Sequence, residues 1–332
     1  KTAWPPTFGM IRSGKEEFRD MSVTEQEAYI QELASVNTDW IDLLFRTAVS
    51  TNHYLSFSGG SEKNTYYVSF GYSKDNGAVK KTDYDRYNLS GKIDANPNKH
   101  LHFQLGFDMA MQNSTGPSTD PFSYAYFANP YERPFNEDGS YRADYTYYKL
   151  PKVNGSYDPT IPPNGFNILR EMNETESKTD NFSITSRFNL DYSFFKQLKF
   201  SGLASYSFTN NKSDNYKGKD TYAAFVDRLY FDTQGNSSRT YSSISQSNTN
   251  NSSYSLRGQL SYSDVYREIH RFSVLAGAEI RGEKAEGIFE KRYGYDPVTG
   301  NSAMPVPKDP GNGEGFKYSD LVSYANAMDQ LS

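Results

Sequence analysis

Histidine and carboxylate side chains are the groups in this sequence best suited to chemistry, and the histidines are few. The chain has 332 residues with no cysteine and 4 histidines, which excludes thiol chemistry and cysteine-based metal centres. His100 and His102 lie two residues apart, so on a strand they would share a face and could grip a metal ion. Because no third ligand accompanies them, we expect solvated residues beside a turn, with no metal and no cofactor.

Charged side chains also recur at alternate positions of several apolar segments. Nothing in the sequence places two of the carboxylates at the separation that an acid–base pair requires. Neither a nucleophile elbow, a P-loop nor a dinucleotide fingerprint is present. We therefore predict that the chain is not an enzyme and that these positions line a lumen. The lumen-facing candidates are Lys92, Asp94, His102, Asp108, Arg187, Asp191, Arg257 and Glu279.

A tyrosine-rich stretch within residues 112–180 offers a different chemistry. Aromatic rings present faces to sugar C–H groups or peptide side chains, and tyrosine adds a hydroxyl. The alternative is that most of these rings pack the long loop against itself, because such a loop must bury something to stay ordered. The candidates for contact with a substrate or partner are Tyr124, Tyr126, Phe127, Tyr131, Arg133, Tyr145, Tyr147 and Tyr148.

The elements that position these side chains are predicted to be strands. In YLSFSGGSEKNTYYVSFGYS (54–73), apolar and polar residues alternate on both sides of a Gly-Gly-Ser turn, which is typical of a hairpin with one dry face. Alternation recurs in LSGKIDA, LHFQLGFDMAM, FSITSRFNLDY, LKFSGLASYSF, YSLRGQLSY and RFSVLAGAEIR. The sequence therefore predicts eight strands, with the face of Tyr66, Val68, Phe70 and Tyr72 toward lipid and the opposite face toward a lumen.

Residues 1–50 lack this alternation. Thr24 to Glu27 forms a potential capping box for a helix that ends near Ala34. A second short helix is predicted after Asp39. That helix would place Ile41, Leu44, Phe45 and Ala48 on one face.

Composition limits the partners. The formal net charge is −5, which gives no electrostatic footprint for nucleic acid. No apolar run reaches the ~18 residues of a transmembrane helix. Aromatic residues make up 16% of the chain, with 28 Tyr and 22 Phe, and tyrosine suits membrane–water interfaces as well as carbohydrate- or peptide-binding surfaces.

Strand length and connection length distinguish a membrane barrel from a soluble sandwich. Several predicted strands reach the ~9–11 residues of a tilted membrane crossing. Short connections at 59–64, 96–100, 193–197 and 264–269 alternate with much longer ones, as in outer-membrane barrels. A soluble sandwich could still turn its polar face outward. The pattern favours an all-β fold, the antiparallel wall of a transmembrane β-barrel.

Two segments carry a more specific signal. NTDWIDLLFRTAVSTNHYLSFSGGSEKNTYYVSFGYSKDNGAVKKTDYDRYNLSGKIDAN (37–96) and ANPYERPFNEDGSY (128–141) resemble the SusC/RagA-like TonB-dependent outer-membrane transporters. The resemblance implies a barrel of ~22 strands around an internal plug, located in the bacterial outer membrane. It also implies nutrient import powered by TonB and a SusD-like surface lipoprotein that caps the barrel.

The resemblance leaves the chain incomplete, because no plug domain or TonB-contacting segment is recognised. We expect an internal barrel fragment of about eight strands that takes part in glycan or peptide uptake. Its expected partners are the SusD-like lipoprotein, the TonB complex through the missing plug region, the substrate and outer-membrane lipid. The alternatives are a secreted soluble β-rich carbohydrate-binding module and a small self-contained outer-membrane barrel.

The expected organisation has three parts. Residues 1–50 form a helical or irregular extracellular segment that leads into the barrel. Residues 51–285 hold the strands, with long loops at 112–180 and 210–250. The segment QGNSSRTYSSISQSNTNNSS in the second loop is low-complexity and predicted to be mobile. Residues 286–332 form a further extracellular loop.

Overall fold

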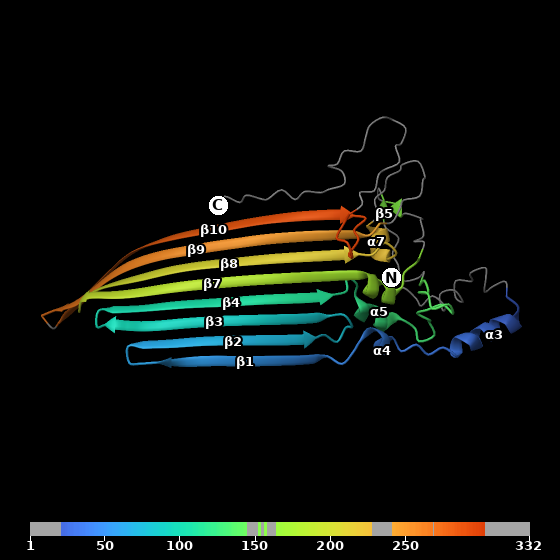
Figure 1. The fold of residues 1–332 in the computed structure, drawn as a ribbon, viewed down its shortest axis with the longest axis horizontal. Coiled ribbons are helices and arrows are strands. Elements are labelled where there is room, and N and C mark those ends of the chain that lie inside the picture. The colour runs from blue at the N-terminus through green and yellow to red at the C-terminus, as the bar shows by residue number, and fades with distance from the viewer. Residues whose placement is uncertain are drawn as a thin grey trace, which may run out of the picture.

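One long antiparallel sheet dominates the computed structural model, which describes residues 21–144, 152–153, 156–157, 164–227, 241–267 and 269–302 (Figure 1). Its strands are β1 (Val49–Gly60), β2 (Asn64–Asn76), β3 (Asp83–Asn98), β4 (Leu101–Gly116), β7 (Thr175–Phe195), β8 (Leu198–Lys217), β9 (Ser243–Tyr266) and β10 (His270–Tyr293). The sheet order is β1-β2-β3-β4-β7-β8-β9-β10. The predicted eight antiparallel strands are confirmed, and β1 and β10 form the edges of the sheet within the described residues.

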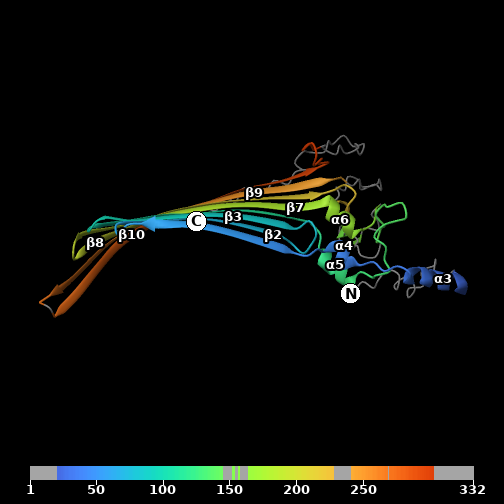
Figure 2. The same cartoon turned by 60° about the horizontal axis from the view of Figure 1, so that its bottom comes forward.

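The later strands are about twice as long as a membrane crossing needs. β7, β8, β9 and β10 contain 21, 20, 24 and 24 residues, against the ~9–11 of a tilted transmembrane strand. The sheet therefore extends well beyond one bilayer thickness. We call the end with the tight connections the turn end and the opposite end, where short helices gather, the cap end (Figure 2).

The extra length corrects three predicted loops. β4 continues to Gly116 and β7 begins at Thr175, so the loop expected at 112–180 is the segment 117–174. The loop expected at 210–250 is 218–242, and the supposedly mobile SSISQSNTNNSS is mostly β9. β10 likewise runs past 285 to Tyr293. These extensions pair through their backbones, but apart from a few residues such as Ile288 and Phe289 of β10 both of their faces are polar, so they lack the alternation that reveals a half-buried strand.

The register keeps apolar side chains on one face across the whole sheet. One row of paired residues consists of Tyr66, Ile93, Leu105, Phe188, Ala204, Leu256 and Ile280. Tyr66 is 52% exposed and Ile280 is 62% exposed. Soluble monomeric proteins rarely expose a contiguous apolar surface of this extent to water. The apolar band spans about 9–11 residues per strand, for example 254–262 on β9, which matches a bilayer crossing.

Helix α3 (Val23–Ala34) precedes the sheet. Its N-cap is Ser22, whose side chain and backbone complete a capping box with Glu25. The predicted box of Thr24 and Glu27 is therefore wrong, because the N-cap lies two residues earlier, at Ser22. No residue of α3 is buried.

Helix α4 (Trp40–Leu44) begins after the N-cap Asp39, as predicted. Trp40 and Leu44 are its buried residues, while Ile41 is 61% exposed. The predicted apolar face is wrong because the helix ends after a single turn. Trp40 and Leu44, four residues apart, share the face that meets the core.

A small helical cluster, the cap, completes the fold. It contains α4, α5 (Pro121–Phe127), α6 (Ile168–Glu174) and α7 (Tyr222–Val226). The two-residue strands β5 (Lys152–Val153) and β6 (Ser156–Tyr157) pair antiparallel in a separate sheet. The buried core of the cap consists of Trp40, Leu44, Tyr124, Phe166, Ile168, Leu169 and Met172. None of the described helices is long and apolar enough to cross a membrane.

Candidate functional site

All the lumen-facing candidates lie on the face opposite the apolar band, which we call the polar face. Asp94, Arg257 and Glu279 belong to one register row, which passes through Gln104, Asn189 and Leu203. Lys92 and Arg187 share the next row through Gly106. Asp108 pairs with Thr185, and His102 pairs with Asp191, on the same face. That this face lines a lumen stays a prediction.

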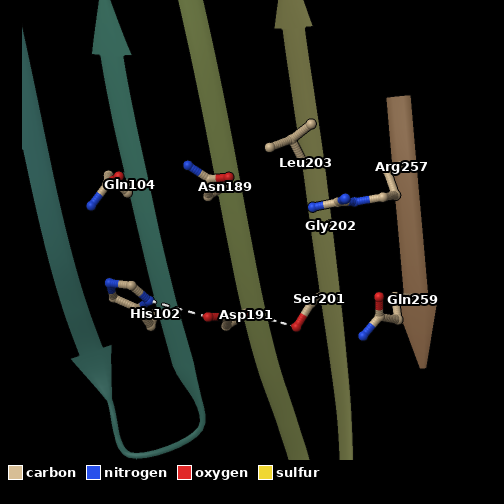
Figure 3. Close-up of a pocket in the computed structure, with 9 residues that line it drawn as sticks. All are labelled: His102, Gln104, Asn189, Asp191, Ser201, Gly202, Leu203, Arg257 and Gln259. Carbon is tan, nitrogen blue, oxygen red and sulfur yellow. Dashed lines mark hydrogen bonds and ion pairs between the residues drawn. The ribbon is translucent and has the colours of Figure 1, made fainter. Parts of the chain in front are cut away.

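The turn end of the polar face holds a network centred on His102. Its Nε2 lies 3.2 Å from Asp94 Oδ1, and its Nδ1 lies 3.5 Å from Asp191 Oδ2. The Asp191 carboxylate also accepts from the Ser201 hydroxyl at 2.6 Å and contacts Lys199 Nζ at 3.2 Å. The imidazole thus bridges two carboxylates from β3 and β7. A cavity of about 370 Å³ opens here (Figure 3), lined in part by Gln104, Asn189 and Arg257.

His100 and His102 do not share a strand face. His100 lies in the turn before β4, where its Nδ1 is 2.8 Å from the Ser193 carbonyl oxygen. His102 instead projects from β4 into its own network. Among the described residues, no group of three or more His, Cys, Asp or Glu side chains could hold a metal ion. The two side chains are separated because β4 begins only after His100, which lies in the turn, as expected from the sequence.

The remaining charges of this zone are mostly paired. Arg187 Nη1 lies 3.2 Å from Asp108 Oδ2. Glu279 accepts from Arg281 Nε at 2.6 Å and from the Ser255 hydroxyl at 3.0 Å. A second cavity, of about 560 Å³, lies beside Lys92, Asp108 and Arg187 and includes the rings of Tyr54, Tyr67 and Phe107. The turn end of the polar face is therefore a charged, hydrogen-bonded surface.

The cap lies over the polar face at the opposite end. Asp227, the C-cap of α7, forms ion pairs with Lys217 of β8 at 3.2 Å and with Lys291 of β10. It also accepts from Ser243 of β9 at 3.3 Å. Because these three partners all project from the polar face, one carboxylate anchors α7 across three strands.

Tyr124 belongs to the cap core and does not offer its ring to a ligand. It is 3% exposed, and its ring centroid lies 5.2 Å from that of Trp40 and 5.7 Å from that of Phe166. The Trp40 Nε1 donates to the Asn129 carbonyl at 2.8 Å, which fixes the following loop. For this tyrosine, the alternative that the loop packs on itself holds.

The other candidates for contact with a substrate or partner form three sets. Tyr126 and Phe127 at the end of α5 are 78% and 59% exposed, with their ring centroids 5.0 Å apart. Tyr131 and Arg133 are half-buried, and Arg133 lies 3.6 Å from Glu32 of α3. The remaining three, Tyr145, Tyr147 and Tyr148, lie outside the described residues.

Burial raises the pKa values of three carboxylates in and beside the cap helices, namely Glu132, Glu171 and Glu174. Burial raises the pKa of Glu171, although its oxygens accept from the backbone N–H groups of Tyr222 and Ala223 at 2.6 and 3.1 Å. Burial raises the pKa of Glu132 to about 7, against a hydrogen bond from Asn129 that lowers it. None of the three residues was singled out from the sequence, because burial cannot be read from a loop without periodicity.

Glu132 should make the stability of the cap depend on pH. Its pKa is higher in the folded cap than in an unfolded chain, so stability is greatest below pH ~4.5 and is lost as pH rises toward 7. The loss should be about 2 kcal/mol after allowance for partial exposure. Glu132→Gln should flatten this dependence, while the exposed Glu137→Gln should preserve it. Amide exchange of residues 128–144, corrected for intrinsic pH effects, measures both, and equal profiles for the two variants would exclude this role for Glu132.

A third cavity lies where the cap meets the polar face, and we call it the rim cavity. It measures about 610 Å³. Its lining includes Val79, Tyr84, Ser114, Pro121, Ser177 and Thr179. One aromatic ring, several apolar groups and several hydroxyls converge here, the mixture typical of small-ligand sites. Two carboxylates also line the cavity: Asp83 forms an ion pair with Arg46 at 2.9 Å, and Asp120 accepts from the Phe122 backbone N–H at 3.0 Å.

Three curated proteins are similar in sequence. The TonB-dependent receptor SusC of Bacteroides thetaiotaomicron is 30% identical over 176 residues, which are 49% of this chain and 17% of that protein. TonB-dependent receptor P26 of Formosa agariphila is 25% identical over 292 residues, covering 82% of this chain and 27% of P26. TonB-dependent receptor P3 of the same organism is 28% identical over 214 residues, covering 61% of this chain and 20% of P3. No family model matches the chain.

Solved structures agree on the fold. The RagAB peptide importer in its closed-closed state superposes with a TM-score of 0.58 at 19% identity, covering 82% of this chain and 29% of that one. The RagAB peptide transporter superposes with a TM-score of 0.58 at 17% identity, covering 87% of this chain and 30% of that one. The chain thus spans 17–27% of the length of the curated relatives it matches. These matches confirm the resemblance noted in the sequence and the outer-membrane location that it implies.

Proposed function

We propose, from the premise that this chain is a SusC/RagA-like TonB-dependent transporter segment of the bacterial outer membrane, that it forms part of the barrel wall of a nutrient importer. The observation that carries the proposal is the division of one continuous sheet into two faces. The apolar face presents a band of bilayer thickness, and the polar face is lined by hydrogen-bonding groups and covered at one end by the cap.

The mechanism proposed is passage along the polar face, without bond chemistry. The charged zone near His102 is paired within the sheet, and it suits contact with another polar surface inside the barrel. The cap end would face the cell exterior, since long connections lie on that side in outer-membrane barrels. In this arrangement the cap and the extended strands form the walls of a chamber above the membrane.

The partners follow from the relatives. SusC, P26 and P3 are named TonB-dependent receptors, so we propose that TonB supplies energy to the complete transporter. RagAB is described as a peptide importer, and we propose glycans or peptides as the substrate of this protein. A SusD-like surface lipoprotein is the proposed lid. Tyr126 and Phe127 are candidates for its contact because both rings are exposed at the cap end.

A soluble carbohydrate-binding module explains the structure less well. It would leave the row from Tyr66 to Ile280 exposed to water across the whole sheet. A small self-contained barrel would require β1 and β10 to meet, and the described sheet keeps them at opposite edges.

Fractionation of the native organism tests the proposal. An antibody raised against this chain should detect an outer-membrane band several-fold heavier than 37.7 kDa, and a surface lipoprotein should co-purify with it. A cytoplasmic or secreted band near 37.7 kDa would contradict the importer proposal and support the soluble carbohydrate-binding module. A band of that mass in the outer membrane would favour the small barrel.

A further inference from the structure

Between the charged zone and the cap, the polar face changes character completely. On three neighbouring strands, every side chain that projects from this face is Ser, Thr or Asn. We call this surface the hydroxyl–amide wall. It comprises Ser177, Thr179, Asn181, Ser183 and Thr185 of β7, Ser207, Thr209, Asn211, Ser213 and Asn215 of β8, and Ser245, Ser247, Thr249, Asn251 and Ser253 of β9.

Solubility alone does not explain this composition on β7 and β8, because the opposite face of these two strands is charged at the same height, whereas that of β9 carries the neutral Gln246, Asn248 and Asn250. Lys178 and Asp180 of β7 stand opposite Asp214 and Lys212 of β8. These side chains form ion pairs along each strand, at 3.5 Å for Lys178–Asp180 and 3.4 Å for Lys212–Asp214. Two faces that were merely exposed to water would resemble each other. On β7 and β8 the wall therefore differs in charge from its reverse side, and exposure to water alone does not account for the difference.

The wall also keeps most of its hydrogen-bonding capacity available. Thr185 and Ser207 bond to each other at 3.0 Å. Across the part of the chain that the structure describes, the other wall side chains have no side-chain hydrogen-bond partner. A hydroxyl can donate one hydrogen bond and accept two, and an amide does both as well.

The rim cavity continues the wall at its cap end. Ser177 and Thr179 belong to both, and Ser114 extends the same register row onto β4. Tyr84 adds a ring to this row. A ligand in the rim cavity would meet one aromatic face beside the paired carboxylates Asp83 and Asp120, and an array of neutral hydroxyls and amides beyond the cavity.

We infer that the wall and the rim cavity accept an uncharged, hydroxyl-rich chain, an oligosaccharide without acidic or basic groups, in preference to a peptide or an acidic saccharide. The inference rests on the proposed importer and specifies its cargo. Neutral hydroxyls exchange hydrogen bonds with sugar hydroxyls at modest net gain per contact. Many weak, equivalent contacts let a chain bind without being trapped. A charged cargo would gain no electrostatic compensation from a wall without charge.

Binding to the purified full-length transporter tests this inference. Isothermal titration would compare neutral hexasaccharides (an α-glucan, a β-glucan, a β-mannan and a β-xylan) with a galacturonate hexasaccharide and a mixed hexapeptide. At least one neutral probe should bind about ten-fold or more tightly than the charged saccharide and the peptide. Thr209→Val with Thr249→Val keeps side-chain shape and removes two hydroxyls, so affinity for that probe should fall about ten-fold.

A gain of binding separates the wall from general damage. Asn211→Lys with Asn251→Lys places two cations on the wall, and affinity for the galacturonate probe should rise about ten-fold. The matched control, Asn248→Lys with Asn250→Lys, places them on the opposite face and should leave that affinity within two-fold.

Tighter binding of the peptide or the galacturonate by the unaltered protein would overturn the inference, and so would binding of none of the neutral probes. Uptake by cells with and without TonB then separates the two proposals. TonB-dependent uptake of the peptide would support the importer proposal and refute only the inference that the cargo is a neutral oligosaccharide. Binding of probes without any TonB-dependent uptake would refute the importer.

Discussion

Leu256→Arg should destabilise the transporter by about 2–4 kcal/mol, the cost of an arginine on the lipid face near the bilayer midplane. Leu256 belongs to the apolar row and is 51% exposed in the sheet. An exposed leucine on a water-facing surface would tolerate the same change within about 0.5 kcal/mol. The size of the loss therefore reports directly on what the apolar face touches.

The matched control lies three residues along the same strand. Gln259 projects from the polar face and lines the cavity near His102, so Gln259→Arg should cost less than about 1 kcal/mol. Urea unfolding of the full-length protein in lipid vesicles compares the two variants. Equal losses would contradict the assignment of the apolar face to lipid, and a larger loss for Gln259→Arg would show that the lipid and lumen faces have been assigned the wrong way round.

Glu171→Ala should uncouple α7 from α6, with a loss of about 3 kcal/mol in the local stability of the cap. The Glu171 side chain is 2% exposed, and its carboxylate accepts two backbone N–H groups at the start of α7. Removing it leaves two buried donors without a partner, and a hydrogen bond to a charged group contributes ~1.5–3 kcal/mol. Amide exchange at Tyr222 and Ala223 should accelerate correspondingly, by about two orders of magnitude.

Two further variants test whether the loss of cap stability comes from the Glu171 carboxylate itself. Glu171→Gln keeps an acceptor oxygen of the same reach and should recover part of the protection. Glu174→Ala, one turn away and only half-buried, should change exchange at these amides by less than about ten-fold. If Glu174→Ala were as harmful as Glu171→Ala, the stabilisation would come from α6 as a whole and the carboxylate would have no special part.

The strands were predictable where one of their faces is apolar. The hairpin 54–73 and the segments around Leu105, Phe188 and Leu256 alternate because the apolar side chains share one environment and the polar ones another. The polar extensions were missed for the same physical reason. In SSISQSNTNNSS both faces are polar, so a fully paired strand has the composition of a mobile loop.

The candidate site was predictable only in part. The polar face could be listed from alternation, but its division into a charged zone and the hydroxyl–amide wall depends on which strands are neighbours. The cap was not predictable either, because Trp40, Tyr124 and Phe166 come from three separate segments. Only the fold brings these rings together, and it converts Tyr124 from a candidate ligand contact into core.

The strictly sequential strand order also constrains how the sheet can assemble. Each long strand pairs with the strand before it in the chain, so no pairing has to wait for a distant segment to arrive. Five of the seven junctions are short connections that cost little loop-closure entropy. The remaining two, 117–174 and 218–242, carry α5, α6 and α7, and these helices pack together with α4 near the strand ends. We therefore expect the chain to enter the membrane as a series of hairpins in order of synthesis, with the two helical connections setting the slow steps.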